Sequence, residues 1–236
     1  MKKSLIFYII FAVYIGSIHL FTYNIPKAAG IQPENTGNNN NKLSLHSLVQ
    51  RGSPLLGNPS APITVVEFGD FQCDRCARFA KATEPQLNQT YIQPGKVNLV
   101  YKYFPNYGPD STTAAVAAQC TNDQGKFWEY HNLLYNNQGP IDSGWANRAN
   151  LKKFASDIPG LDTQKFNSCF DSQKNKPIVE NNVALAHSLG FTQTPSFIIV
   201  KSDGSNPQKL EGPQLFPEFK FLLDKELGGA INRSIV

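Results

Sequence analysis

The sequence predicts an α/β domain in which a long helical segment separates two groups of strands. Runs rich in β-branched and aromatic residues, which are typical of buried strands, lie at 63–71, 97–105 and 194–200. Residues 111–190 carry helical patterns instead. With 41% hydrophobic and 17% charged residues among 236, the chain can bury a sizeable core. Its net charge is +4 without a long basic run, so we expect no nucleic-acid partner.

The first residues predict a membrane anchor. Lys2 and Lys3 precede residues 5–23, which contain no Asp, Glu, Lys or Arg and as a helix would span roughly 28 Å, close to the apolar thickness of a bilayer. A cleaved signal peptide has a shorter apolar core, and the candidate site "KAAG" fits the small-x-small cleavage rule poorly. A buried core helix would not stand at the N-terminus before a linker. We therefore expect residues 1–4 in the cytoplasm, an uncleaved transmembrane signal anchor over 5–23, and the rest on the extracytoplasmic side.

Residues 24–42 predict a flexible linker, because the stretch 30–42 is rich in Gly, Pro and Asn and nearly free of apolar side chains. The folded part should form a strand-containing domain from 43–110 and 191–236, interrupted by a helical insertion over 111–190. Its predicted elements are a short helix over 43–52, a strand over 63–71, a helix over 74–90, a strand over 97–105, the helical block, a strand over 194–200, a hairpin turn over 201–207, a strand over 208–212 and a helix over 216–227.

Cys73 and Cys76 form a CxxC motif where the strand over 63–71 gives way to a helix. At a helix N-terminus the unpaired backbone N–H groups and the helix dipole favour a thiolate, so Cys73 should have a lowered pKa. A structural staple that spans two residues would restrict almost no chain entropy. A zinc site would need four ligands, usually in two close pairs, whereas Cys120 and Cys169 stand alone. The motif therefore favours thiol–disulfide exchange, with no metal.

Three motifs in this order resemble the DsbA-like family of thioredoxin-fold proteins: "VVEFGDFQCDRC", "DQGKFWEYHNLL" and "LGFTQTPSFIIV". The resemblance covers residues 57–228. It implies a thioredoxin fold, with a mixed central sheet flanked by helices and a helical insertion domain. It also implies that Cys73 is the sulfur that partners attack, that Cys76 is the resolving cysteine, and that the exchange needs no cofactor.

Further site residues are implied by the same resemblance. The Thr194–Pro195 peptide bond should be cis and lie against the cysteines as a platform for an extended substrate backbone. Glu67, six residues before Cys73, stands where the family has an acidic residue beneath the active site. It could relay a proton to or from Cys76, or it could be a strand-end glutamate in water; a pairing with Lys102 on the next strand is a weaker possibility.

The dipeptide between the cysteines, Asp74-Arg75, departs from the pairs common in the family, which often carry proline or an aromatic residue. Arg75 should stabilise the thiolate of Cys73, whereas Asp74 should oppose it. These two residues are therefore expected to tune the redox potential. Because the two effects oppose each other, the sequence leaves open whether this chain shares the redox direction of the family.

Cys120 and Cys169 lie 49 positions apart in the predicted insertion. In an oxidising compartment two free thiols in one small domain would be unusual, so we predict a structural disulfide between them. Two buried free cysteines are the alternative, since cysteine is often buried.

These features together predict a membrane-anchored, extracytoplasmic protein thiol–disulfide oxidoreductase. Its substrates would be cysteine-containing exported proteins, and a redox partner would recycle the Cys73–Cys76 pair. Disulfide formation is the favoured direction. A reductase or isomerase of the same fold is an alternative, as is a thioredoxin-fold binding module without turnover. Trapping of clients by Cys76→Ser would separate an enzyme from a binding module.

Overall fold

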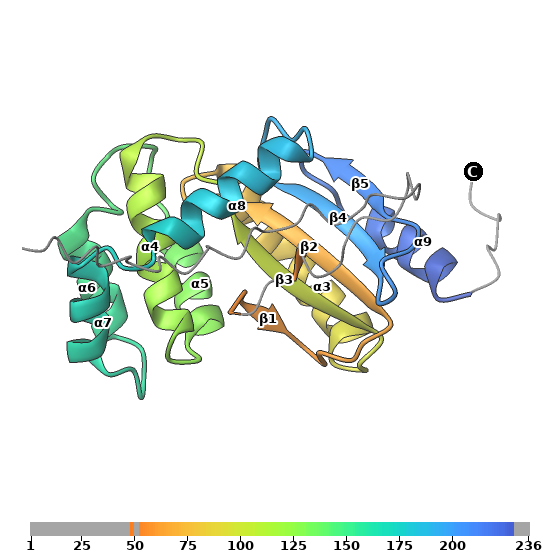
Figure 1. Cartoon of the computed structure of the whole chain (residues 1–236), viewed down its shortest axis with the longest axis horizontal. Helices are drawn as coiled ribbons and strands as arrows, with labels where there is room; N and C mark the ends of the chain where they lie inside the picture. Colours follow the sequence, from red (N-terminus) through yellow and green to blue (C-terminus); the bar gives the residue numbers. More distant parts are fainter. Residues whose placement is uncertain (1–47, 50–51, 229–236) are drawn as a thin grey trace, which may run out of the picture. The chain divides into compact units, whose positions relative to one another are not determined.

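A computed structural model describes residues 48–49 and 52–228 (Figure 1). Five strands form one mixed sheet with the order β1-β3-β2-β4-β5, in which β2 and β3 are parallel and the other pairs are antiparallel. The strands are β1 (Leu55–Leu56), β2 (Ile63–Gly69), β3 (Val97–Tyr103), β4 (Ser196–Lys201) and β5 (Gln208–Glu211). The sequence prediction missed β1, which is only two residues long and carries no periodic signal.

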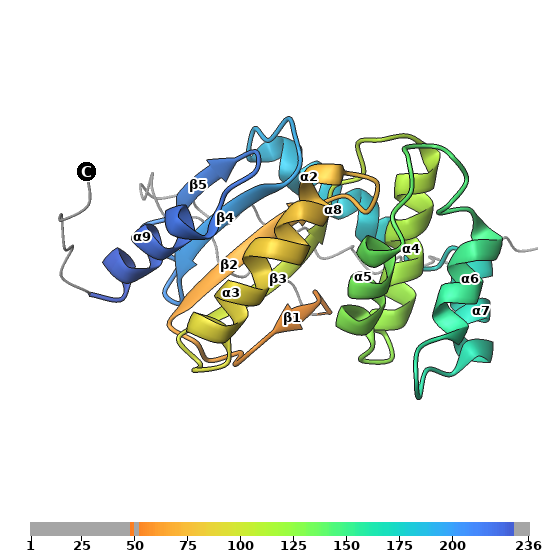
Figure 2. The same ribbon diagram turned by 180° about the vertical axis from the view of Figure 1, so that it is seen from behind.

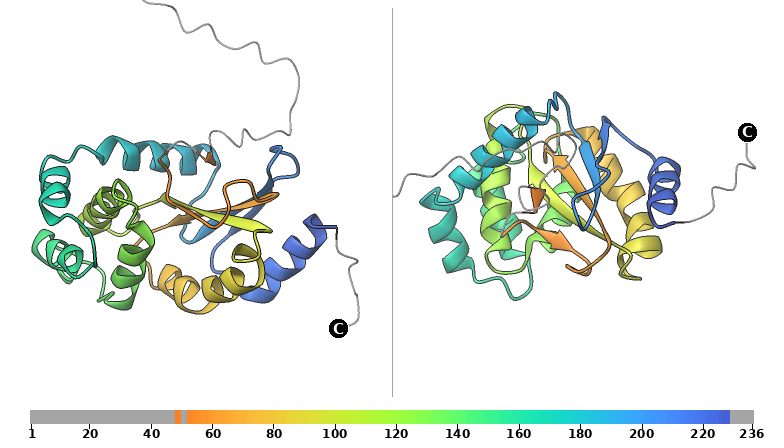
Figure 3. Two further views of the ribbon diagram at one scale, coloured as in Figure 1. Left: turned by 90° about the horizontal axis from the view of Figure 1, so that it is seen from below. Right: turned by 45° about the vertical axis from the view of Figure 1, so that its right-hand side comes forward.

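The two central strands are buried on both faces, which explains why their sequences are apolar almost throughout. On one face, Val65 and Leu99 pack with residues of α3 (Glu84–Leu87) and of α9 (Phe216–Glu226). On the other face, Val66 and Val100 pack with α8 (Lys176–Ser188). Figure 3 shows this layering, with the sheet between α8 on one side and α3 and α9 on the other.

The chain is helical without a break from Asp74 to Ile92, as the expected helix over 74–90 requires, but two π-helical turns interrupt the α-helix. The segments are α2 (Asp74–Arg78), η1 (Phe79–Thr83), α3 (Glu84–Leu87) and η2 (Asn88–Ile92). Pro85 at the start of α3 has no N–H to donate to the preceding turn, which accounts for a widened turn before it. This helix carries the CxxC motif at its N-terminus (Figure 2).

The helical insertion lies between β3 and β4 and is built around its own apolar cluster, which continues to the cysteine pair. Its helices are α4 (Pro109–Asn122), α5 (Phe127–Asn136), α6 (Arg148–Ser156), α7 (Thr163–Asp171) and α8. Gly125, at φ +69°, lies in the turn that separates α4 from α5. The last helix, α8, also covers the sheet, so the insertion and the sheet domain share a layer.

The predicted anchor over 5–23 and the linker over 24–42 lie outside the described residues, as does most of the expected helix over 43–52. Within 48–49 and 52–228, no helix combines the length and the apolar character needed to cross a membrane.

Candidate active site

The cysteine pair lies at the N-terminus of α2, and both side chains are free thiols without solvent exposure. Cys73 is the N-cap residue, with an extended backbone, and its Sγ accepts a hydrogen bond from the backbone N–H of Cys76 at 3.4 Å. The backbone N–H of Cys73 in turn donates to the carbonyl of Asp70 at 3.0 Å. The helix start therefore places backbone N–H groups around one sulfur and leaves the other inside the protein.

The two sulfurs differ sharply in acidity. A hydrogen bond from the Cys76 side chain, which outweighs the opposing effect of burial, lowers the pKa of Cys73 to about 6. The Thr194 side chain and the backbone N–H groups of Arg75 and Cys76 lower that pKa further. Burial above all raises the pKa of Cys76 well above its ordinary value, and the proximity of Cys73 adds to this. In the reduced protein Cys73 is thus the thiolate and Cys76 keeps its proton.

Thr194 and Pro195 face this pair from the loop before β4. Their peptide bond is cis, and the carbonyl oxygen of Thr194 lies 3.3 Å from Cys73 Sγ, although the two residues are 121 positions apart in the chain. The resemblance implied this contact. Because Pro195 has no N–H, the backbone beside the reactive sulfur offers an acceptor, which an extended peptide could pair with.

Asp74 and Arg75 point to different partners. Arg75 donates to Gln193 Oε1 at 3.2 Å and to the Tyr107 hydroxyl at 3.1 Å. Its hydrogen bond with Tyr107 and, to a lesser degree, its proximity to Cys73 raise the pKa of Arg75. Asp74 is 72% exposed and pairs with Arg78 at 2.8 Å. The arginine therefore lies over the active site, whereas the charge of Asp74 is compensated within its own helix.

The sequence analysis does not predict the polar network that lies under the CxxC loop. Asp70 is 2% exposed, and its carboxylate accepts hydrogen bonds from the backbone of Asn106, at 2.6 Å, and of Tyr107, at 3.1 Å. Burial above all raises the pKa of Asp70. From the insertion, Gln138 Nε2 donates to the carbonyl of Cys73 at 3.0 Å. The insertion thus fixes the backbone that carries the reactive sulfur.

Glu67 of β2 has no solvent exposure, so the interpretation of a strand-end glutamate in water is wrong. Burial first, and then the charges of Glu84 and Cys73, raise the pKa of Glu67 well above its ordinary value. The possible pairing with Lys102 is also wrong. Glu67 is in register with Tyr101, which places Lys102 on the opposite face of the sheet, and Lys102 Nζ donates to Ser53 Oγ at 2.8 Å instead.

Two further residues, Glu84 of α3 and His131 of α5, join Glu67 in a buried cluster. One donor atom from each of the three lies within 4.8 Å of the others. Carboxylates and imidazole can bind divalent cations, but a closed structural zinc site has four protein ligands and this cluster offers three. Burial raises the pKa of Glu84 to about 8 and lowers the pKa of His131 to about 4. At neutral pH the cluster is therefore largely without charge.

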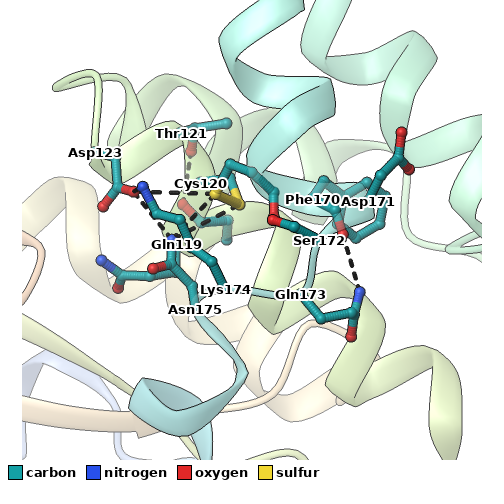
Figure 4. The surroundings of a disulfide bond; sticks show 12 residues. Gln119, Cys120, Thr121, Asp123, Phe170, Asp171, Ser172, Gln173, Lys174 and Asn175 are labelled. Carbon is teal, nitrogen blue, oxygen red and sulfur yellow. Dashed lines mark hydrogen bonds and ion pairs between the residues drawn. A yellow bond between two sulfur atoms is a disulfide. The ribbon is translucent and has the colours of Figure 1, made fainter.

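The second cysteine pair lies in the insertion. A disulfide joins Cys120 of α4 to Cys169 of α7, with 5.9 Å between the Cα atoms. Figure 4 shows its polar surroundings: Asp123 pairs with Lys174 at 3.0 Å, and Asn175 Nδ2 lies 3.1 Å from Asp123 Oδ2 and 3.3 Å from Cys169 Sγ. The bridge connects two helices of the insertion, and Oδ2 of the neighbouring Asp123 is paired with Lys174 and Asn175.

Comparison with known proteins agrees with this geometry. The family model described as Thioredoxin matches residues 50–224. The probable disulfide bond formation protein D of Bacillus cereus is 30% identical over 230 residues, which are 96% of this chain and 96% of that protein. The disulfide bond formation protein D of Bacillus subtilis is 26% identical over 181 residues, 76% of this chain and 79% of that protein.

Solved structures agree as well. The oxidised form of BdbD from Bacillus subtilis superposes with a TM-score of 0.66 at 27% identity, over 75% of this chain and 94% of that one. Alpha-DsbA1 from Wolbachia pipientis gives a TM-score of 0.66 at 28% identity, over 77% and 94%. The similarity spans both the sheet and the helical insertion. With its paired thiols of unequal acidity beside a cis-proline, the chain belongs to the DsbA-like protein thiol–disulfide oxidoreductases of the thioredoxin family.

Proposed function

We propose that this chain forms disulfide bonds in cysteine-containing exported proteins, as a membrane-anchored enzyme on the extracytoplasmic side. The observation that carries the direction of the reaction is the lowered pKa of Cys73, at about 6. Whatever stabilises the thiolate stabilises the reduced enzyme, and a stabilised reduced form makes the disulfide a stronger oxidant. The names of the relatives, disulfide bond formation protein D, support the same direction.

The reaction starts from the Cys73–Cys76 disulfide. A client thiolate attacks Cys73 Sγ, a bond forms between the client and Cys73, and the electron pair of the broken bond goes to Cys76 Sγ, which takes up a proton. A second client thiolate then attacks the client sulfur of this mixed disulfide. Cys73 leaves with its electron pair as a thiolate, which suits its low pKa. The client is oxidised by two electrons, and the enzyme retains one thiolate and one thiol.

Three groups serve this exchange in the proposal. The cis peptide bond between Thr194 and Pro195 supports the backbone of the client beside Cys73. Arg75 lies over the thiolate with its guanidinium held by Gln193 and Tyr107. Glu67, which is buried, is the proton donor for Cys76; the two groups interact electrostatically, because an ionised Glu67 raises the pKa of Cys76.

The location of the enzyme is inferred from the sequence. Lys2 and Lys3 precede an uncharged segment over 5–23 that is long enough to cross a bilayer. The disulfide between Cys120 and Cys169 fits an oxidising compartment. Each turnover leaves the enzyme reduced, so a redox partner on the same side of the membrane must oxidise Cys73 and Cys76 again.

Two measurements on the full-length protein test the proposal. Equilibration with glutathione buffers should place its potential nearer the ~ −120 mV of strong oxidants than the ~ −270 mV of thioredoxin. In cells, Cys76→Ser should accumulate mixed disulfides with exported proteins through Cys73, because Cys76 can no longer release a bound client by attacking Cys73 Sγ. A potential near that of thioredoxin would make the enzyme a reductase. If Cys76→Ser traps no client, the chain is a binding module instead.

A further inference from the structure

Four buried polar atoms beneath the active site lack a hydrogen-bond partner among the described residues. They are Oε1 and Oε2 of Glu67, Oε2 of Glu84 and Nε2 of His131. An unsatisfied buried polar group costs about 1–3 kcal/mol. A cluster of such groups that comes from three separate elements, β2, α3 and α5, therefore lowers the stability of the fold and calls for a functional reason.

The spacing within the cluster suits the passage of a proton. His131 Nε2 lies 3.8 Å from Glu84 Oε2, and one oxygen of Glu67 lies within 4.8 Å of both. Small side-chain movements, or a bridging water molecule, would join polar atoms at this spacing by hydrogen bonds. His131 Nδ1 is 3.0 Å from Asn132 Oδ1, and with this oxygen as acceptor the ring proton lies on Nδ1. Nε2 is then an acceptor that faces the carboxyl group of Glu84.

Glu84 connects the cluster with the surface. Glu67 and His131 have no exposure, whereas Glu84 is 7% exposed. Glu84 lines a groove of about 430 Å³ on the surface, together with Lys81 and Asn88 of the same helical segment and residues of α5. A proton from solvent can therefore reach the carboxyl group of Glu84 without a rearrangement of the fold.

At its other end the cluster interacts electrostatically with Cys76, which has no exposure of its own. The charge of Glu67 raises the pKa of Cys76, and the charge of Glu84 raises the pKa of Glu67. The titratable groups nearby also include Cys73, Asp70, Tyr101 and Tyr135, and the hydroxyls of the two tyrosines lie 3.0 Å apart. Burial raises the pKa of both tyrosines well above the ordinary value, so both stay neutral. The route from the groove to Cys76 thus runs through the two carboxyl groups.

We propose that Glu84, positioned by His131, exchanges protons between the surface groove and Glu67, and so reloads the donor that protonates Cys76. This rests on the proposed function. When the Cys73–Cys76 bond breaks, the electron pair on Cys76 takes the proton of the Glu67 carboxyl. Glu84 then returns a proton to the Glu67 carboxylate and takes another from water in the groove. When the redox partner restores the disulfide, the same proton leaves by the reverse path.

The test is the rate at which dithiothreitol reduces the Cys73–Cys76 disulfide of the oxidised full-length protein. This rate is measured from pH 5 to pH 9 at constant buffer concentration. General acid–base catalysis contributes about 10²–10⁴-fold. Since Glu84 acts one step away from the reacting sulfur, Glu84→Gln should slow the reduction by less than loss of a direct proton donor would, by about tenfold. Glu84→Ala should be slow as well, and formate that enters the groove should restore its rate in proportion to concentration. The matched control is Glu129→Gln on α5, where Glu129 is 47% exposed and pairs with Lys126; its rate should equal that of the wild type.

Formate rescue would not follow from a structural defect, because a small acid replaces the proton donor and not the packing. The proposal is overturned if Glu84→Gln and Glu129→Gln reduce at the same rate, or if Glu84→Ala is slow and formate leaves it slow. One equivalent of tightly bound divalent metal in the purified protein would overturn it too. If Glu67→Gln is slow while both Glu84 variants match the wild type, the proposed function stands and only the route is wrong. A wild-type protein that does not exchange with dithiols would remove the proposed function itself.

Discussion

Cys73 and Cys76 are separated by two residues at the start of α2, whereas Cys120 and Cys169 join α4 to α7 across 49 positions. A bridge between the first two would constrain almost no chain entropy, while a bridge between the second two closes a long loop. The first pair lies against the backbone at Thr194, and the second connects helices within the insertion. Loop length and neighbours thus separate a disulfide that is exchanged from one that holds the fold.

The acidic residues near the two cysteine pairs differ as well, in whether their carboxyl groups have partners. Beside the second pair, Asp123 is held by Lys174 and Asn175. Beside the first, Glu67 has no hydrogen-bond partner within the described part of the chain, and Glu84 lacks one there at Oε2. A compensated carboxylate contributes to stability, whereas an uncompensated buried carboxyl group holds a proton that it can give up. The acidic surroundings of Cys120 and Cys169 therefore stabilise the fold, whereas those of Cys73 and Cys76 destabilise it.

The largest effect should come from removal of the attacked sulfur. Cys73→Ser should reduce dithiol oxidation to the uncatalysed rate, because Cys76 then has no partner with which to form the exchanged disulfide and is itself buried. The double variant Cys120→Ala/Cys169→Ala should stay within about twofold of the wild-type rate at temperatures where it is folded. Single-turnover oxidation of a dithiol peptide measures both. If the double variant were as inactive as Cys73→Ser, the distinction between the pairs would be wrong.

The next effect is on stability. By chain-entropy reasoning, loss of the Cys120–Cys169 bridge should lower the free energy of unfolding by about 4 kcal/mol, since the bridge closes a loop of 49 positions. Urea denaturation under non-reducing conditions measures this. The control is the double variant Cys73→Ala/Cys76→Ala, whose free energy of unfolding should lose much less. Equal losses from both pairs would contradict the assignment of one bridge as structural.

A third prediction concerns the pH dependence of stability. The folded-state pKa of Glu84, about 8, exceeds its unfolded value of 4.5, so between these values the native state binds more protons than the unfolded state. The free energy of unfolding therefore falls as the pH rises through this window. Relative to Glu84→Gln, the wild type should lose on the order of 3 kcal/mol between pH 4.5 and pH 7. His131 contributes an opposite slope below its unfolded pKa of 6.5, in both proteins. Urea denaturation of both proteins at a series of pH values measures this. The prediction would be contradicted if the free energy of unfolding depended on pH in the same way in both proteins.

The smallest effects should come from the dipeptide between the cysteines. Arg75→Ala should raise the pKa of Cys73, because the guanidinium lies over the thiolate. Asp74→Ala should lower it by much less, since the Asp74 carboxylate is exposed and paired with Arg78. Changes of roughly 0.5 and 0.2 units are of the size expected for exposed charges. Ultraviolet absorbance of the thiolate against pH measures both, and a larger shift from Asp74→Ala than from Arg75→Ala would reverse the assignment.

The sequence predicted those parts of the site that have a local signal. The strand β2, the CxxC motif at a helix start and the motif around Pro195 are each contained in a short stretch of chain. Glu84 and His131 have no such signal, because their proximity to Glu67 depends on how α3 and α5 pack against β2. The one hint was a polar residue within an apolar stripe, since His131 lies among Phe127, Tyr130 and Leu134 on α5. The network around Asp70 was missed for the same reason.

The separation of Cys73 from Thr194 by 121 positions has a consequence for the timing of synthesis. The CxxC motif leaves the ribosome long before the segment that completes its surroundings, and β4 must pair with β2 around the whole insertion. Contacts this distant in sequence form late in folding. A half-made chain therefore carries two ordinary thiols, and oxidising power arises only in a finished molecule.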